Sequence, residues 1–271
     1  MGYQTLNRKT ALKNAAEEFR LEECYDTVGK ESFKNCIKIK QMQLPEVSLI
    51  ESQGFYSCTA LRRAQMPRIT RIGKEAFAGC SNLREAVFPS GFLSLGSGAF
   101  SKCKRLETAV FQDNRRCKKL PSQAFAECRG LKKLVLPKNL EEIGERCFFK
   151  CDSLREVTLP RTLKRIGDKG FYQCGFTSLT LPENLEEIGE SAFLKCKKLT
   201  YIKIPEKVKR IGKWAFHGCD LLECLEIHHD PEEIGEWITN KNCVIKCKKD
   251  SKMEEYAREY QIKVQYITDI A

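Results

Sequence analysis

The chain has 271 residues, of which 42% are hydrophobic and 31% charged, and its formal net charge at pH 7 is +11. It contains no apolar run of about 18 residues, the length that a membrane-spanning helix needs. The N-terminus lacks the apolar segment of a secretory signal peptide, and Leu6 stands where a myristoylation signal after Gly2 requires Ser or Thr. We therefore expect neither a membrane span nor a lipid anchor.

Residues 1–27 predict an N-terminal cap, because the end coils of a repeat protein need a cover against water. Leu12, Ala15, Ala16 and Phe19 follow one another at roughly helical spacing. This spacing predicts that the cap is a helix.

Residues 28–227 repeat one pattern nine times, with a period of 22 to 25 residues. Each copy has a Phe with a small residue before it and a Cys three positions after it. A fixed period in this range predicts a solenoid, because each unit can bury its apolar side chains only against its neighbours. The nine pairs are Phe33 with Cys36, Phe55 with Cys58, Phe77 with Cys80, Phe100 with Cys103, Phe125 with Cys128, Phe148 with Cys151, Phe171 with Cys174, Phe193 with Cys196, and Phe216 with Cys219.

Within a copy, alternating apolar residues after the Cys predict a β-strand with one buried face. Leu154, Val157 and Leu159 show this alternation. Pro160 then ends the strand, because proline cannot donate a hydrogen bond to a sheet. A second extended piece and a short helical or 3₁₀ turn are expected to lead to the next Phe.

The motif LPxxLxxIGxxAFxxCxxLxxI resembles the BspA-like, or Treponema-type, leucine-rich repeat across residues 28–227. This resemblance implies a right-handed, β-rich superhelix with a parallel sheet on its concave face and short helical or 3₁₀ turns elsewhere. Two copies depart from the motif. The copy around Cys174 is one residue short, and the copy that ends at Gln112 lacks its Pro and runs into a longer loop.

Residues 228–271 predict a C-terminal cap that begins with a short rung and resembles the tails of this family. Ser251 and Glu254 form a capping-box pattern, so a helix is expected over about 251–260. Ile262, Val264 and Tyr266 then alternate, which predicts a last strand over about 262–267.

The chain has 15 cysteines. Stacked strands lie about 4.8 Å apart, which is wider than the roughly 3.8 Å between the Cβ atoms of a disulfide. The nine repeat cysteines and Cys147 are therefore predicted to be buried free thiols, which favours the reducing cytoplasm. Secretion or surface display is the alternative, because the resembled family includes many surface proteins.

Charge is unevenly distributed along the chain. Residues 28–137 carry 20 basic and 8 acidic side chains, a net charge of +12 that can attract an acidic partner. The alternative is a soluble surface without a partner. In the later copies, acidic and basic pairs alternate, so opposite charges should face each other when the coils are in register. The pairs are Glu141 with Glu142, Lys164 with Arg165, Glu186 with Glu187, Lys209 with Arg210, and Glu232 with Glu233.

The outward positions of the predicted strands form a candidate partner-binding face. Val87, Val110 and Val135 occupy equivalent positions in three consecutive copies and predict an apolar stripe. An apolar centre with a polar rim is typical of protein interfaces, although valine is also simply common in strands. The basic residues expected beside the stripe are Arg62, Arg63, Arg84, Lys132, Lys133 and Arg155.

The longer loop at 113–120 is a second candidate site. Arg115, Arg116, Lys118 and Lys119 surround Cys117, and nearby cations lower the pKa of a thiol and favour the reactive thiolate. The alternative is a solvated basic loop without a partner.

No catalytic, cofactor-binding or metal-binding site is predicted. No phosphate-binding glycine motif occurs, and the three histidines have no nucleophile placed beside them by the repeat. His228 and His229 with Cys243 and Cys247 are a weaker zinc hypothesis, because their spacing is loose.

The sequence thus predicts a monomeric, non-catalytic leucine-rich-repeat scaffold that binds a protein partner through its concave face. Binding of nucleic acid or another polyanion by the basic first half is the main alternative, although the concave rows of that half have no Tyr or Trp for base stacking. A surface adhesin is the third possibility, if the chain derives from a protein with a secretion signal.

Overall fold

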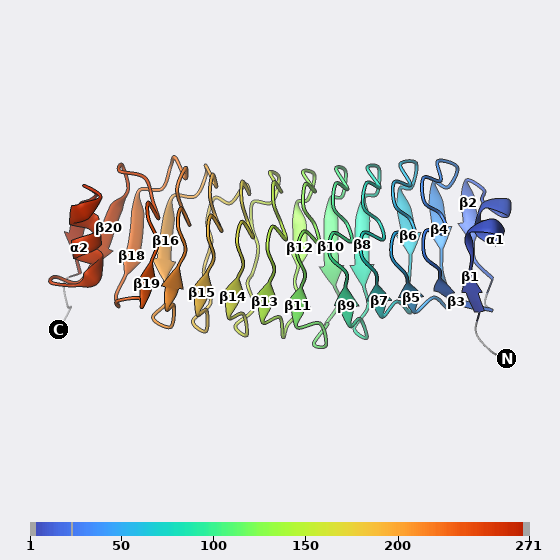
Figure 1. The fold of residues 1–271 in the computed structure, drawn as a ribbon, viewed down its shortest axis with the longest axis horizontal. Helices are drawn as coiled ribbons and strands as arrows, with labels where there is room; N and C mark the ends of the chain where they lie inside the picture. The colour runs from blue at the N-terminus through green and yellow to red at the C-terminus, as the bar shows by residue number, and fades with distance from the viewer. Residues whose placement is uncertain (1–3, 23, 268–271) are drawn as a thin grey trace.

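The computed structural model describes residues 4–22 and 24–267. The chain forms an elongated parallel β-solenoid of about 11 turns, with its two ends at opposite ends of the stack (Figure 1). The predicted repeat solenoid is confirmed. The two helices of the described residues, α1 (Arg8–Lys13) and α2 (Lys252–Glu259), lie in the first and last parts of the stack.

Most turns contribute one strand to each of two long faces. The pre-phenylalanine sheet consists of the strands that lead into the Phe turns: β1 (Gln4–Leu6), β3 (Tyr25–Val28), β5 (Leu49–Ile50), β7 (Arg71–Ile72), β9 (Ser94–Leu95), β11 (Lys119–Leu120), β13 (Glu142–Ile143), β14 (Arg165–Ile166), β15 (Glu187–Ile188), β17 (Arg210–Ile211) and β19 (Glu233–Ile234). It is interrupted once, between β9 and β11. The post-cysteine sheet consists of the other strands: β2 (Glu18–Arg20), β4 (Gln41–Gln43), β6 (Arg63–Gln65), β8 (Glu85–Phe88), β10 (Thr108–Phe111), β12 (Lys133–Val135), β16 (Tyr201–Ile204), β18 (Cys224–Ile227), β20 (Val244–Cys247) and β21 (Lys263–Tyr266).

The repeated Phe and Cys residues form the internal columns that the sequence predicts. Neighbouring Phe rings stack with centroids 5.0 to 5.6 Å apart, from Phe33 to Phe216. From Cys58 to Cys219, each thiol donates to the carbonyl oxygen of the Phe in the preceding coil, at 3.0 to 3.3 Å. The core is therefore one continuous column rather than a set of separate globular cores.

The post-cysteine sheet is interrupted twice. Its strands form three separate sheets, β2-β4-β6, β8-β10-β12 and β16-β18-β20-β21. Between β12 and β16, residues 155–159 and 177–181 follow the path of two further strands without forming a regular ladder. Among the described residues, only the hydrogen bond from Thr177 N to Arg155 O, at 3.4 Å, joins these two segments through their backbones.

The shortened copy lies at this second interruption. At its turn, a Cβ atom on Gly175 would collide with the carbonyl oxygen of Asp152 in the preceding coil. The missing residue thus draws the turn against its neighbour, and only glycine fits this close backbone approach. The pre-phenylalanine sheet stays continuous here, because Glu142, Arg165 and Glu187 remain paired in register.

The N-terminal segment differs from its prediction. The helix α1 covers only Arg8–Lys13, and Phe19 is buried in the strand β2. The predicted helix through Leu12, Ala15, Ala16 and Phe19 is therefore wrong. The segment is an imperfect first coil: β1 pairs with β3 and β2 pairs with β4, and these pairings continue both sheets. Sheet pairing with the next coil has overridden the weak helical spacing.

At the other end, α2 covers the last coil. The side chain of Ser251 accepts from Glu254 N at 3.3 Å, and the Glu254 carboxylate accepts from Asp250 N at 2.7 Å. The hydroxyl of Tyr256 accepts from Ile238 N at 2.9 Å, so the helix satisfies a backbone donor that no further coil covers. The boundaries predicted for the two caps, at residues 27 and 228, stay a prediction.

Candidate partner-binding surface

Val87, Val110 and Val135 lie side by side on β8, β10 and β12, in parallel register. Val87 and Val110 are half-buried, and Val135 is 41% exposed. We call these three residues the valine ridge. The structure places them as the sequence predicts, on the outward side of the sheet.

Large side chains beneath the ridge support it. The residue before each ridge valine is buried. It is Ala86 on β8, Ala109 on β10 and Leu134 on β12. Phe88 and Phe111 follow one step further along the strands, and their rings stack with centroids 4.2 Å apart. Small alanines leave room for these additional rings, which keeps the interior close-packed.

The basic residues predicted beside the ridge gather along one edge of the post-cysteine sheet. Among them, Arg63 pairs with Glu85 at 3.0 Å and Arg84 pairs with Glu107 at 3.5 Å. The remaining four are exposed and form no ion pair with the residues that the structure describes; they are Arg62, Lys132, Lys133 and Arg155. We call all six the basic edge. Its unpaired cations can meet a carboxylate without first breaking an internal ion pair.

A hollow lies on each side of the valine ridge, where the sheet is interrupted. The first has a volume of about 480 Å³ and is lined by Val87 together with Ala64, Met66 and Pro67. The second, which we call the trough, has a volume of about 680 Å³ and lies between β12 and residues 178–183. The ridge is thus the raised centre of a longer surface rather than an isolated stripe.

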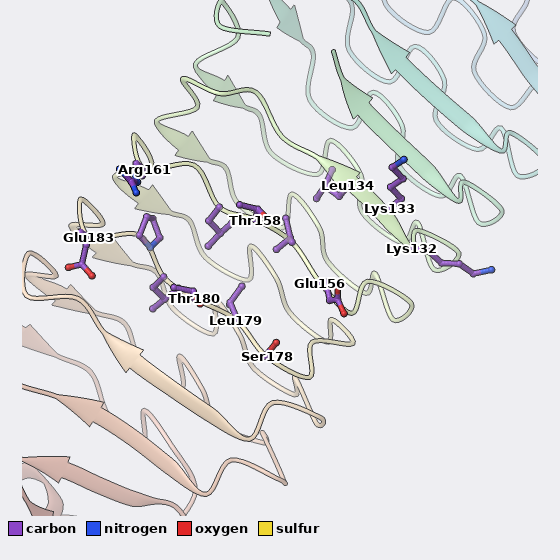
Figure 2. A pocket seen from close by; sticks show the side chains of 14 residues that line it. Lys132, Lys133, Leu134, Glu156, Thr158, Arg161, Ser178, Leu179, Thr180 and Glu183 are labelled. Atoms are coloured by element: carbon purple, nitrogen blue, oxygen red, sulfur yellow. The ribbon is translucent and has the colours of Figure 1, made fainter. Parts of the chain in front are cut away.

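The trough combines a mixed polar and apolar lining with a charged rim. Figure 2 shows Lys132, Lys133 and Glu156 toward one end of the trough, and Arg161 and Glu183 toward the other. Between these ends, the exposed Thr158, Ser178 and Thr180 and the half-buried Val157 line it. The buried Leu134, Leu159, Leu179 and Leu181 lie beneath them. Sequence reasoning missed this hollow, although the shortened copy around Cys174 was its signal.

The loop at 113–120 is built differently from the prediction. Cys117 is completely buried, and this burial raises the pKa of its thiol to about 11. The hypothesis of an exposed, reactive Cys117 is therefore wrong. The buried amide of Asn114 organises the loop: it donates to Phe92 O at 2.7 Å and accepts from Cys117 N at 2.9 Å. The backbone is thereby folded so that Cys117 points into the core.

The cations of this loop have unequal surroundings. Lys118 pairs with Glu141 at 3.0 Å and Lys119 pairs with Glu142 at 2.9 Å. Arg115 and Arg116 are exposed. Two of the four cations thus belong to ion pairs between coils, which weakens the loop as a candidate binding site.

Alternating ion pairs run along the pre-phenylalanine sheet, as the sequence predicts. Arg165 lies 3.4 Å from Glu142 and 2.8 Å from Glu187, and Arg210 lies 3.0 Å from Glu187 and 3.0 Å from Glu233. We call this series of ion pairs, which begins with Lys119 and Glu142, the charge ladder. Since opposite charges face each other only in the correct register, the ladder favours that register over a slip by one coil.

A buried carboxylate on β18 was not singled out from the sequence. Glu226 is 8% exposed and lies 2.8 Å from His228, 3.0 Å from Lys246 and 3.3 Å from Lys203. Burial opposes its ionisation, but hydrogen bonds from Lys246, Lys203, His228 and Tyr201 outweigh burial and lower its pKa to about 2. The alternation of Lys203, Glu226 and Lys246 on neighbouring strands was the available signal.

The histidines of the zinc hypothesis have other contacts. His228 hydrogen-bonds to Glu226, and His229 Nε2 lies 2.7 Å from Val208 O. Within residues 4–22 and 24–267, no group of three or more His, Cys, Asp or Glu side chains is arranged to hold a metal ion. Neither helix of these residues has the length or apolar composition that crossing a bilayer requires.

Parallel coils with a buried Phe column, proline-terminated strands and a polar outer surface define a leucine-rich-repeat solenoid. The profile of the BspA type leucine rich repeat region matches residues 7–117 and 118–246. The chain belongs to this family.

Two solved structures show the same fold. A leucine-rich repeat protein from Bacteroides ovatus is 20% identical with a TM-score of 0.64, and the match covers 93% of this chain and 92% of that one. A leucine rich cell surface protein from Faecalibacterium prausnitzii is 21% identical with a TM-score of 0.55, covering 84% of this chain and 68% of that one. A search of curated proteins found no match.

Proposed function

We propose that the protein is a non-catalytic scaffold that binds another protein through the post-cysteine sheet, with the valine ridge at the centre of the interface. The observation that carries this proposal is the alignment of Val87, Val110 and Val135 beside a basic edge with unpaired cations. An apolar centre can be desolvated, while a charged rim steers association. Leucine-rich repeats of this family generally mediate protein interactions, which supports the proposal.

The test begins with affinity capture from the native cell and identification of the captured protein. Val110→Asp should reduce the measured affinity for that protein at least tenfold, because it places a charge in the centre of the interface. Val244→Asp is the matched control, since Val244 is a half-buried valine on β20, away from the ridge in the last of the three post-cysteine sheets. Unchanged affinity in Val110→Asp, with the fold intact by circular dichroism, would contradict the proposal.

Polyanion binding by the basic first half is the second candidate, and it is supported by the net charge of +12 over residues 28–137. The two candidates differ in their dependence on salt. Nucleic-acid binding weakens steeply and log-linearly as salt is added, and Val110→Asp would then act only as one more negative charge. Arg62→Glu and Arg84→Glu should instead slow association with a protein partner, as changes to rim charges do.

We propose a cytoplasmic location, because so many buried free thiols suit a reducing compartment. The alternative is the cell surface, because the similar Faecalibacterium prausnitzii protein is described as a cell surface protein. Fractionation of the native cell, with an antibody against the protein, separates the two.

A further inference from the structure

The trough adjoins the valine ridge, so a partner on the ridge would reach it. Lys133 and Leu134 line the trough and belong to β12, the strand that also carries Val135. The proposal below therefore rests on the proposed function and specifies which part of the partner binds here.

The backbone around the trough has free hydrogen-bonding groups. Residues 156–159 and 178–181 run in the strand direction, and within the described chain they make no backbone hydrogen bond to a neighbouring coil. Extended peptides bind proteins by pairing with such unpaired strand backbones. Free backbone groups suit a polypeptide better than a nucleic acid, which has phosphates and no amide backbone.

The rim of the trough favours an acidic segment. Lys132 and Lys133 are adjacent, exposed and free of ion pairs to any described residue. Arg161 is the third cation of the rim, and Glu156 and Glu183 are its two carboxylates. Arg155, which precedes Glu156 in the chain, is a further exposed cation.

We propose that the trough binds an extended, acidic segment of the protein partner. An aliphatic side chain of that segment lies against Val157, the half-buried apolar residue of the lining, and a neighbouring carboxylate pairs with Lys132 and Lys133. The site lies at the second interruption of the post-cysteine sheet, where the copy around Cys174 lacks one residue.

Fluorescence anisotropy with labelled ten-residue peptides tests this proposal directly. A peptide that alternates Leu and Asp should bind at least tenfold more tightly than one that alternates Leu and Lys, and at least tenfold more tightly than one that alternates Ser and Asp. Equal binding of the Ser–Asp peptide, tighter binding of a DNA duplex, or no binding of the Leu–Asp peptide would overturn the proposal.

Two variants locate the site. Lys132→Glu with Lys133→Glu should weaken the Leu–Asp peptide at least tenfold, whereas Lys248→Glu with Lys249→Glu should change its affinity less than twofold. Both double variants change the net charge equally, and Lys248 and Lys249 are also adjacent and exposed. Equal losses of affinity in the two double variants would show that the peptide responds only to the overall positive charge, and would overturn the proposal.

A third variant guards against misfolding of the charge variants. Thr158→Trp fills the trough from an exposed position, and it should also weaken the Leu–Asp peptide at least tenfold; unchanged affinity would overturn the proposal. None of these residues is altered in the test of the valine ridge. A partner that depends on Val110 but not on Lys132 and Lys133 would therefore reject the trough and leave the proposed function standing.

Discussion

The thiol of Cys151 donates a hydrogen bond of 3.3 Å to the carbonyl oxygen of Phe125 in the preceding coil. The same oxygen accepts from Cys128 N at 3.2 Å, which closes the turn of its own coil. One carbonyl oxygen thus accepts both the hydrogen bond that closes its own turn and the hydrogen bond from the next coil. This double use explains why Phe and Cys recur together at a spacing of three residues, since the turn and the contact between coils share one acceptor.

Alkylation should distinguish the thiols by burial. Cys24 is exposed, so brief treatment of native protein with iodoacetamide should modify it first. Cys117 and Cys151 should react only on unfolding, because both are fully buried and burial raises the pKa of each thiol. Peptide mass spectrometry measures the order, and modification of Cys117 as fast as Cys24 would contradict the structure.

Arg165→Glu should destabilise the fold, because it replaces two attractive contacts of the charge ladder with two repulsive ones. We expect a loss of about 1–2 kcal/mol at low salt, given roughly 0.2–1 kcal/mol for an exposed pair. The loss should shrink in high salt as exposed charges are screened.

Lys164→Glu is the control for this ladder variant, because the ion pair between Lys164 and Glu141, at 4.0 Å, is longer than those of Arg165. Urea unfolding at two salt concentrations gives both values. Equal losses of unfolding free energy in Arg165→Glu and Lys164→Glu would mean that the short contacts of Arg165 add no stability beyond the change in charge.

Asn114→Ala should cost roughly 1–3 kcal/mol, the usual penalty for leaving buried backbone groups without partners. The amide of Asn114 donates to Pro89 O, Ser90 O and Phe92 O, at 3.3, 3.1 and 2.7 Å. Asn139→Ala removes a more exposed amide bonded to Arg115 O at 3.2 Å, and it should cost less than about 0.5 kcal/mol. Thermal unfolding of the two variants provides the comparison. Equal unfolding midpoints would show that Asn114 does not hold the loop.

Glu226 should make stability depend on pH in the acid range. Its pKa in the folded state is about 2, below the roughly 4.3 of an unfolded glutamate. The unfolded state therefore binds more protons between these values, and stability falls as the pH is lowered from about 4.3 toward 2.

Glu226→Gln should remove this part of the acid sensitivity, while lowering stability at pH 7 because Lys203 and Lys246 lose their shared partner. Glu223→Gln, a change at an exposed carboxyl one residue before β18, controls for the lost charge. Melting temperatures from pH 7 to pH 2.5 provide the comparison, and parallel profiles for wild type and Glu226→Gln would reject the assigned role.

The periodic features of the fold could be predicted because each depends on residues within one repeat and the same positions in the next. The Phe and Cys columns, the outward valines and the charge ladder all follow from stacking equivalent positions at a spacing of about 4.8 Å. Cys117 could not be placed in this way. Its position depends on how the amide of Asn114 folds an inserted loop against the carbonyl groups of the preceding coil.

The sequence by itself determined the solenoid, its coil spacing and the side chains that face its core, because a repeat of fixed length leaves each coil one way to bury its apolar residues. Tertiary structure alone decided where the post-cysteine sheet opens. The one-residue deficit near Cys174 is visible in the sequence, but the opening depends on how the turn at Gly175 meets Asp152 while the Phe column and the opposite sheet stay continuous. The candidate trough lies where one sheet is interrupted while the Phe column and the opposite sheet remain continuous.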